Sequence, residues 1–389
     1  MDIKQVAEQY AEYVIALRRH FHAFPEISEH EVETGKYIRN ELTNMGVEWR
    51  PCGKGNGALA TIRGGKPGRT ILLRGDMDGL SVQEETGAEY ASRNPGVMHA
   101  CGHDCHTAML LTAARILKDV QEELPGTVVL AYQPAEEVGG GAKDMIADGA
   151  LSGVDGCFAI HVWADVEAGK VSVEPGPRMA SVDQFRISVT GKGSHGAAPH
   201  QGIDAAVAVC GMVTSLQSVV SREIDPAQPA VLTVGIVSAG TRFNVVAEHG
   251  YIEGTTRSFC PEVREQLKTA IERVVKSTAD GYRVRAELEW LTPVPPLLND
   301  THMACVAKRA ARTVMGEDAP VPGEKTSGGE DFAYFLERVP GAIAWLGIHN
   351  EACGAVWPQH SGRFCVDESV LLKGAMLYAQ TAVEFNAGE

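Results

Sequence analysis

Short apolar runs alternate with helical segments in the first half of the chain. Residues 57–64, 70–79, 127–137 and 156–163 each contain such a run, and each run ends in glycine or polar residues. A helical pattern over residues 106–124 separates the second run from the third. Buried strands that alternate with helices are typical of an α/β fold with a mostly parallel sheet and helices on both faces. Such a sheet binds ligands at the carboxyl ends of its strands.

A different order of elements begins near residue 180. The pattern predicts strands over residues 183–193, 230–240, 251–259 and 283–293, with helices over residues 202–224 and 262–279. This order is that of a small four-stranded sheet with two helices. We therefore predict that residues 180–292 form an inserted domain, and that residues 1–179 and 293–389 together form one discontinuous domain.

The charge and the cysteine content of the chain indicate which partners and which cellular compartment to expect. The chain has 50 acidic and 35 basic residues, whereas nucleic-acid binding depends on clustered lysine and arginine, so we expect no nucleic-acid partner. We find neither a signal-peptide pattern in residues 1–21 nor the roughly 18 continuous apolar residues of a membrane span. The nine cysteines are scattered and odd in number, which favours a reducing compartment. We expect a cytoplasmic protein without a membrane partner.

One segment combines thiol and imidazole groups. Residues 99–106 hold three histidines, two cysteines and an aspartate at the start of an apolar helical pattern. Cys101 and His103 are two positions apart, so in an extended loop their side chains point the same way. Thiolate and imidazole ligands suit zinc and similar divalent ions. The alternative for this segment alone is a capped helix entry with an inert thiol.

Other candidate groups follow the predicted strands. Glu136 and Glu137 end an apolar strand, and adjacent residues face opposite ways, so one could hold a metal ion while the other faces a bound water; a solvated loop is the alternative. Asp78 ends another strand, where it could orient a metal-bound imidazole. His161 lies within an apolar run, where a hydrogen-bonded core histidine is the alternative. His360 belongs to this group only if the fold returns its segment to the same end of the sheet.

These motifs, in this order, resemble those of a known enzyme family. The chain is similar to the dinuclear-metal amidohydrolases of the aminoacylase and carboxypeptidase superfamily, in the branch of N-acyl-amino-acid amidohydrolases, hippurate hydrolases and auxin-conjugate hydrolases. The resemblance covers nearly the whole chain and is most specific in MHACGHD and QPAEE; it also includes RRHFHAFPEIS, LLRGDMDGL, AIHVW, GKGSHGAAPHQGIDA, GGEDFAYF and HSGRF. It implies metal-dependent hydrolysis of the amide bond of N-acyl amino acids, which releases the free amino acid and a carboxylic acid.

The resemblance also implies a metal centre with two divalent ions. Zinc and manganese are the expected metals, and nickel and cobalt are further choices. The ions would be held by five side chains, those of Cys101, His103, Glu137, His161 and His360. Glu136 would be the general base, and Asp78 the orienting carboxylate behind the metal centre.

The inserted domain would be a ferredoxin-like lid that also forms a homodimer or a higher homo-oligomer. In the family, a histidine at the position of His195 often reaches the neighbouring subunit's site and polarises the scissile carbonyl. Asn244 and Arg257 match positions that bind the substrate's free carboxylate.

Several alternatives stay open. The chain departs from the family's usual sequence at Gly75, Gly79, Ser81, Cys105 and Gly329, which leaves the preferred acyl group and amino acid undefined. Within the superfamily, a dipeptidase or an N-acetyl-diaminopimelate-type deacetylase is the alternative. Outside it, the alternatives are a hydrolase with a cysteine nucleophile, at position 101 or 105, and a non-catalytic metal-binding protein.

Overall fold

The computed structural model describes residues 1–387 and consists of two units. The first comprises Met1–Gly176, Leu298–Glu324 and the described residues from Glu330 onward, and the second comprises Pro177–Leu297 and Lys325–Gly329. The segment Lys325–Gly329 differs from the expected division, which placed it in the first domain. The amide of Ala180 donates to the carbonyl of Thr326 at 3.2 Å, and the amide of Thr326 donates to the carbonyl of Arg178 at 3.0 Å. Backbone pairing over so few residues leaves no periodic pattern in a sequence.

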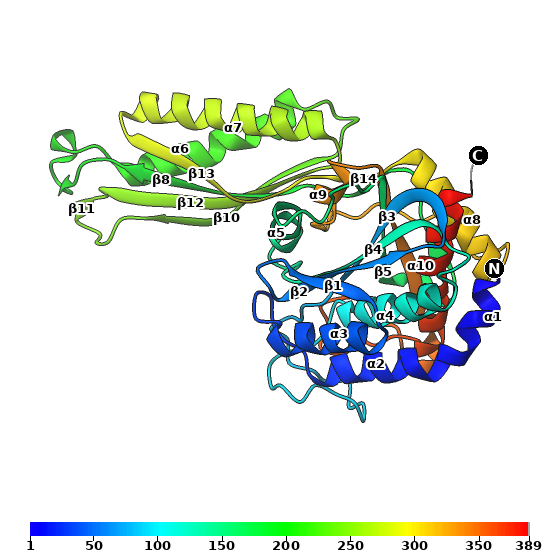
Figure 1. Ribbon diagram of the computed structural model, residues 1–389. Helices are drawn as coiled ribbons and strands as arrows, with labels where there is room; N and C mark the ends of the chain where they lie inside the picture. Colours follow the sequence, from blue (N-terminus) through cyan, green and yellow to red (C-terminus); the bar gives the residue numbers. More distant parts are fainter. Residues whose placement is uncertain (388–389) are drawn as a thin grey trace. The chain divides into compact units, whose positions relative to one another are not determined.

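A seven-stranded sheet forms the centre of the first unit (Figure 1). Its strand order is β1-β2-β4-β3-β5-β15-β6. The four inner strands are parallel to one another: β4 (Pro125–Gln133), β3 (Lys66–Asp76), β5 (Gly156–Glu167) and β15 (Gly341–His349). The outer strands run antiparallel to their neighbours: β1 (Glu48–Cys52), β2 (Gly57–Arg63) and β6 (Val171–Ser172). The predicted α/β fold with a parallel centre is confirmed.

Helices cover both faces of this sheet. The longer ones are α2 (Ala11–Ala23), α3 (Val32–Asn44), α4 (His103–Asp119), α8 (Thr301–Met315) and α10 (Leu371–Asn386). The shorter ones are α1 (Ile3–Ala7), α5 (Gly141–Ala147) and α9 (Ala333–Leu336). In Figure 1, α2, α3 and α4 lie below the sheet, whereas α5 and α9 lie above it. Helix α4 is buried nearly all round, so the polar residues of its first turn lie inside the protein.

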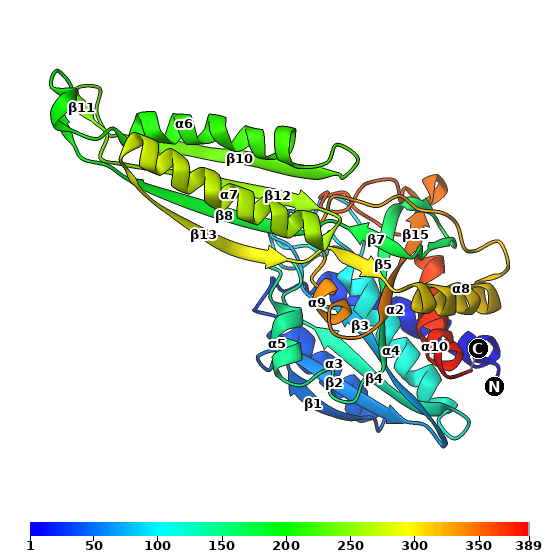
Figure 2. The same cartoon turned by 90° about the horizontal axis from the view of Figure 1, so that it is seen from above.

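The second unit has a four-stranded antiparallel sheet in the order β10-β12-β8-β13. Its elements along the chain are β8 (Val182–Thr190), α6 (Ala205–Ser218), β10 (Ala230–Ala239), β12 (His249–Ser258), α7 (Pro261–Tyr282) and β13 (Arg285–Val294). Helices α6 and α7 lie on one face of the sheet (Figure 2) and share its hydrophobic core. A small second sheet pairs β9 (Ser194–His195) with β11 (Val245–Val246). The strands β7 (Gly176–Met179) and β14 (Leu297–Asn299) are where the chain enters and leaves this unit.

One helical stretch of the second unit, Ala205–Glu223, has the length and mean hydropathy, 1.3, of a membrane span. Its buried residues recur every three or four positions and belong to the core of the unit: Ala205, Ala208, Val209, Met212, Leu216 and Val219. A helix packed by one face on a sheet has the same pattern. The stretch is therefore weak evidence for a membrane span.

Candidate active site

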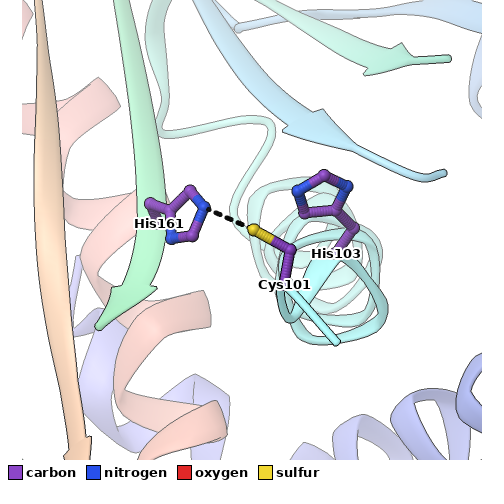
Figure 3. A group of neighbouring side chains, drawn as sticks. All are labelled: Cys101, His103 and His161. Atoms are coloured by element: carbon purple, nitrogen blue, oxygen red, sulfur yellow. Dashed lines mark hydrogen bonds between the residues drawn. The ribbon is translucent and has the colours of Figure 1, made fainter. Parts of the chain in front are cut away.

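The turn before helix α4 sets two predicted ligands side by side. Gly102, between Cys101 and His103, has φ of 96°, in the left-handed region that favours glycine. A Cβ atom at Gly102 would lie 2.3 Å from a side-chain methyl of Val162, so the close approach to strand β5 also requires glycine. Figure 3 shows the Cys101 and His103 side chains at the start of α4, with His161 facing them from β5.

His161 directs one ring nitrogen at the Cys101 thiol. Its Nε2 lies 3.4 Å from Cys101 Sγ, and its Nδ1 donates to the carbonyl of Val162 at 2.6 Å. Because a carbonyl only accepts, Nδ1 carries the proton and Nε2 of the neutral ring has a free lone pair. Burial lowers the pKa of His161 well below its usual value. A neutral imidazole is the form that binds a metal ion.

His103 is oriented by Asp78. Its Nδ1 donates to Asp78 Oδ1 at 3.1 Å, while Asp78 Oδ2 accepts the hydroxyl of Ser28 at 2.6 Å and the amide of Glu137 at 3.0 Å. Asp78 therefore orients the ring of His103 and also holds the backbone of Glu137, a second candidate ligand. The other ring nitrogen of His103, Nε2, is buried and has no hydrogen-bond partner.

Glu136 and Glu137 follow a strained turn at the end of β4. Ala135 has φ of 56°, and its amide donates to the buried carboxylate of Glu31 at 2.7 Å. This bond stabilises a backbone conformation that costs a residue other than glycine about 1–2 kcal/mol. Glu137 Oε1 lies 3.8 Å from His103 Nε2 and, like that nitrogen, is buried without a hydrogen-bond partner.

The loop after β15 returns His360 to the same place. Its amide donates to the carbonyl of Ala100 at 2.8 Å, next to Cys101, and its Nε2 lies 3.6 Å from Glu137 Oε1. His360 also has a positive φ, 66°. Strained backbone of this kind is common where a side chain must be held in one position for function.

The five predicted ligands form overlapping groups. Within each group the ligand atoms lie within 4.8 Å of one another: Cys101 with His103 and His161, Cys101 with Glu137 and His360, and His103 with Glu136 and Glu137. Sulfur, imidazole nitrogen and carboxylate oxygen together suit divalent transition metals. Buried polar atoms without a partner, here His103 Nε2 and Glu137 Oε1, are costly unless a ligand satisfies them. The residues present therefore fit a metal ion.

Glu136 lies next to this group in a strongly acidic environment. Burial, with the carboxylates of Glu330, Glu137 and Asp331, raises the pKa of Glu136 well above its usual value. A carboxylate with a raised pKa holds a proton more readily, which suits general acid–base chemistry. Burial and the Glu137 carboxylate also raise the pKa of the Cys101 thiol, and an un-ionised thiol is a poor nucleophile.

His195, in the second unit, has an exposed ring with a defined tautomer. Its Nδ1 accepts the amide of Ala197 at 3.0 Å, so in the neutral ring Nε2 carries the proton and can donate it. The amide of Gly196 donates to the carbonyl of Asn244 at 2.8 Å. Asn244 and His195 are thus neighbours.

Arg257 lies far from Asn244 within this unit. The β9–β11 pairing, which includes His195, continues beyond the His249 end of β12, whereas Arg257 lies at the other end of that strand. Eight residues of extended chain between positions 249 and 257 span about 27 Å. One copy of the second unit therefore holds Asn244 and Arg257 at a wide separation.

Sequence reasoning missed the supporting role of His106. It donates through Nδ1 to Asp76 at 2.5 Å and accepts the amide of Val162 through Nε2 at 2.8 Å, so it holds the chain of β5 beside His161. The signal for it was present in the sequence, because His103 and His106 are three residues apart and therefore share one face of a helix.

Gly75, Gly329 and Cys105, three of the departures from the family's usual sequence, lie in closely packed surroundings. A Cβ atom at Gly75 would lie 3.1 Å from the carbonyl oxygen of His106, and one at Gly329 would lie 2.3 Å from a methyl of Val182. Cys105 is fully buried in the core of the first unit. None of the three is a candidate ligand.

Comparison with known proteins gives one consistent result. Residues 72–384 match Peptidase family M20/M25/M40. The chain is 39% identical over 370 residues to N-acetyl-L-cysteine deacetylase of Bacillus subtilis (strain 168), with 95% of this chain and 87% of the relative covered. It is 37% identical over 380 residues to IAA-amino acid hydrolase ILR1-like 4 of Arabidopsis thaliana, with 97% and 86% covered.

A solved structure agrees with these relatives. The Bacillus subtilis YXEP protein, described as a dinuclear metal binding peptidase from the M20 family, matches with a TM-score of 0.84 and 35% identity, covering 97% of this chain and 98% of that chain. Fold, site and matches together define a metal-dependent amidohydrolase. The chain belongs to Peptidase family M20/M25/M40. The family predicted from the motifs is confirmed, and the cysteine-nucleophile and non-catalytic alternatives are set aside.

Proposed function

We propose that the protein hydrolyses the amide bond of N-acyl amino acids with two divalent metal ions, zinc or manganese. The observation that carries this proposal is a pair of buried ligand atoms without hydrogen bonds, His103 Nε2 and Glu137 Oε1, which lie 3.8 Å apart beside the Cys101–His161 pair. The names of two relatives, an N-acetyl-L-cysteine deacetylase and an IAA-amino acid hydrolase, support the substrate class. The ligands would be Cys101, His103, Glu137, His161 and His360.

Glu136 is the general base of the proposed reaction. Bound divalent ions supply two effects, a lowered pKa of water and a polarised amide carbonyl. Glu136 takes the proton from the attacking water and delivers it to the leaving amine, which departs only once it is protonated. Its carboxylate lies within 4.8 Å of the ligand atoms of His103 and Glu137, which supports this role. Asp78 keeps the His103 ring and the Glu137 backbone in position during the reaction.

Residues 180–292 are proposed as a ferredoxin-like lid that also forms a dimer. The strand order β10-β12-β8-β13 with two helices supports this topology. Strand β10 lies at the edge of the sheet and exposes Val231, Ile236 and Val237, each by at least 42%. An exposed apolar edge strand is a template for pairing with a second chain, which supports a homodimer.

In this dimer, His195 polarises the scissile carbonyl in the other subunit's site. The exposed Nε2–H of its neutral ring supports that role, and one such donor contributes about 3–4 kcal/mol to an oxyanion. Asn244 accompanies His195, while Arg257 binds the substrate carboxylate from the subunit that holds the metal ions. The wide separation of Asn244 from Arg257 within one chain supports this division between subunits.

The cytoplasm is the proposed compartment. All nine cysteines are free, as a reducing compartment requires. A dipeptidase or an N-acetyl-diaminopimelate-type deacetylase is the alternative activity, because both reactions need the same metal centre.

The test is a substrate panel on protein stripped of metal and reloaded with zinc, manganese, nickel or cobalt in turn. The panel contains N-acetyl and N-benzoyl amino acids, dipeptides and N-acetyl-diaminopimelate, and elemental analysis counts the bound ions. We expect no turnover without metal and the highest kcat/KM on an N-acyl amino acid after reloading. Full activity of metal-free protein would refute the metal centre, and a preference for dipeptides would refute the substrate class.

A further inference from the structure

A buried arginine, Arg74, connects three segments of the chain behind the candidate site. It is 1% exposed, and its guanidinium donates to four side chains at 2.5 to 3.4 Å: Gln133 Oε1, Asp76 Oδ2, both carboxylate oxygens of Glu330, and Asp331 Oδ1. A buried charge is tolerated when it is paired and hydrogen-bonded. The planar fork of arginine meets these four groups at once, which the single nitrogen of lysine does not.

Asp331 attaches the segment that carries Glu136 at three points. Its Oδ1 accepts the side-chain amide of Gln133 at 2.7 Å, before Glu136 in the chain. Its Oδ2 accepts the backbone amide of Ala142 at 3.0 Å, after Glu136. Its own backbone amide donates to Glu136 Oε1 at 3.3 Å. Asp331 thus contacts Glu136 itself and also one residue on each side of it in the chain, Gln133 and Ala142.

Glu330 determines where the Asp331 amide points. Its Oε1 accepts both Arg74 Nη2 at 2.9 Å and the backbone amide of Phe332 at 2.9 Å. These two bonds close the turn that contains Asp331. Arg74 also lies over the ring of Phe332, 5.7 Å from its centroid. The direction of the amide that contacts Glu136 therefore depends on the Arg74–Glu330 contact.

We infer that Arg74 and Glu330 are positioning residues that act through the Asp331 amide to orient the carboxylate of Glu136. This inference rests on the proposed function, because it assigns the two residues to the reaction of that base. A misplacement of about 1 Å lowers the rate of an enzyme reaction roughly 100-fold. Because neither Arg74 nor Glu330 contacts the substrate in this proposal, their substitution should lower kcat and leave KM unchanged.

The test compares Arg74→Lys, Glu330→Ala and Glu330→Gln with the unchanged enzyme, with kcat expressed per metal-loaded, folded site. We expect kcat to fall about 10- to 100-fold in the lysine and alanine variants, with KM within about threefold and metal content unchanged. Glu330→Gln keeps one oxygen to accept the 2.9 Å bonds from Arg74 Nη2 and Phe332 and loses only the 3.4 Å bond from Arg74 Nη1, so it should recover most of the loss. A purely structural role would lower the melting temperature and leave kcat per folded site unchanged.

Arg264→Lys is the matched control. Arg264 donates two bonds of 2.8 Å to Asp183 in the second unit, and its replacement should leave kcat unchanged. The inference is overturned if Arg74→Lys and Glu330→Ala keep the original kcat, or if their loss lies in KM or follows metal loss. If Arg74→Lys does not fold, the two Glu330 variants decide.

A crystal structure of Glu330→Ala gives a reading that does not depend on activity. We expect the Glu136 carboxylate to have moved away from the Asp331 amide, and an unmoved carboxylate would overturn the inference. Absence of turnover on any N-acyl amino acid by the unchanged enzyme would instead refute the proposed substrate class. The positioning role would then be tested in the same way on whichever amide substrate the panel identifies.

Discussion

His103 donates its Nδ1 proton to Asp78 at 3.1 Å, and both side chains are buried. This bond directs His103 Nε2 at the other candidate ligands. Asp78→Ala should weaken metal affinity about 10- to 100-fold, the usual effect of losing such a partner. Asp78→Asn keeps an acceptor oxygen and should lose less. Calorimetric titration of the metal-free protein measures both, and an unchanged affinity of the alanine variant would contradict the assignment.

The Glu136→Gln variant separates the base from the ligands. Glutamine has nearly the same shape but accepts no proton at neutral pH, so kcat should fall by about 10²- to 10⁴-fold. Elemental analysis should find the metal content unchanged. The control is Glu122→Gln, an exposed residue, which should have no effect on kcat. Retained turnover in Glu136→Gln would show that another group is the base.

Mixed dimers test which residues act across subunits. If His195 serves the other subunit, inactive Glu136→Gln and His195→Ala proteins should regain activity when mixed, up to about a quarter of the original sites for random pairing.

The separation of Asn244 from Arg257 extends this test. Arg257→Ala should also complement His195→Ala, whereas Asn244→Ala should not, since Asn244 lies beside His195. Activity after subunit exchange is the measurement, and complementation between the Asn244 and His195 variants would place those two residues in different sites.

Gly102 should tolerate no side chain. Gly102→Ala introduces a Cβ atom 2.3 Å from Val162 in a backbone with positive φ, which should cost about 1–3 kcal/mol of the free energy of unfolding. Gly281→Ala is the control, because Gly281 lies in α7 with nothing near its Cβ position and should stabilise by about 0.4–1 kcal/mol. Urea denaturation of both variants compares the two values. Equal stability of the two would contradict the argument.

His22 should contribute stability that depends on pH. Its ring contacts Asp104 at 2.8 Å and Glu84 at 3.3 Å. Burial and Arg18 lower the pKa of His22, but these carboxylates raise it overall above the usual 6.5. A raised pKa in the folded state means that the protonated form stabilises the fold below about pH 6.5, and that this contribution is lost as the pH rises through the folded pKa.

The His22→Gln variant tests this direction. The difference in the free energy of unfolding between the original protein and the variant should be larger at pH 6 than at pH 9. Urea denaturation at the two values measures it. A difference that grows towards pH 9 would show that His22 is neutral in the folded state.

Local patterns predicted much of the fold and part of the site. Strands β3, β4 and β5 and helix α4 follow from runs and periodicities of a few residues, which need no distant contact. The pairing of Cys101 with His103 is also local. The short strands β9 and β11 escaped prediction, because two residues of extended chain carry no periodicity.

The roles of Arg74 and Asp331 could not be predicted, because they depend on contacts between residues 257 positions apart in the sequence. Nothing in the residue pattern says which of several carboxylates a buried arginine meets. The separation of Asn244 from Arg257 has a different origin: the two are close in sequence, but strand β12 runs between them.

The sequence alone determined the family, the α/β class and the residue types available for metal binding, because motifs and hydrophobic periodicity are properties of neighbouring positions. Only the tertiary structure decided that Cys101, Glu137, His161 and His360 converge, and that His103 and Glu137 present buried atoms without hydrogen bonds. The physical reason is the parallel order of the inner strands, which brings the ends of distant segments to one edge of the sheet.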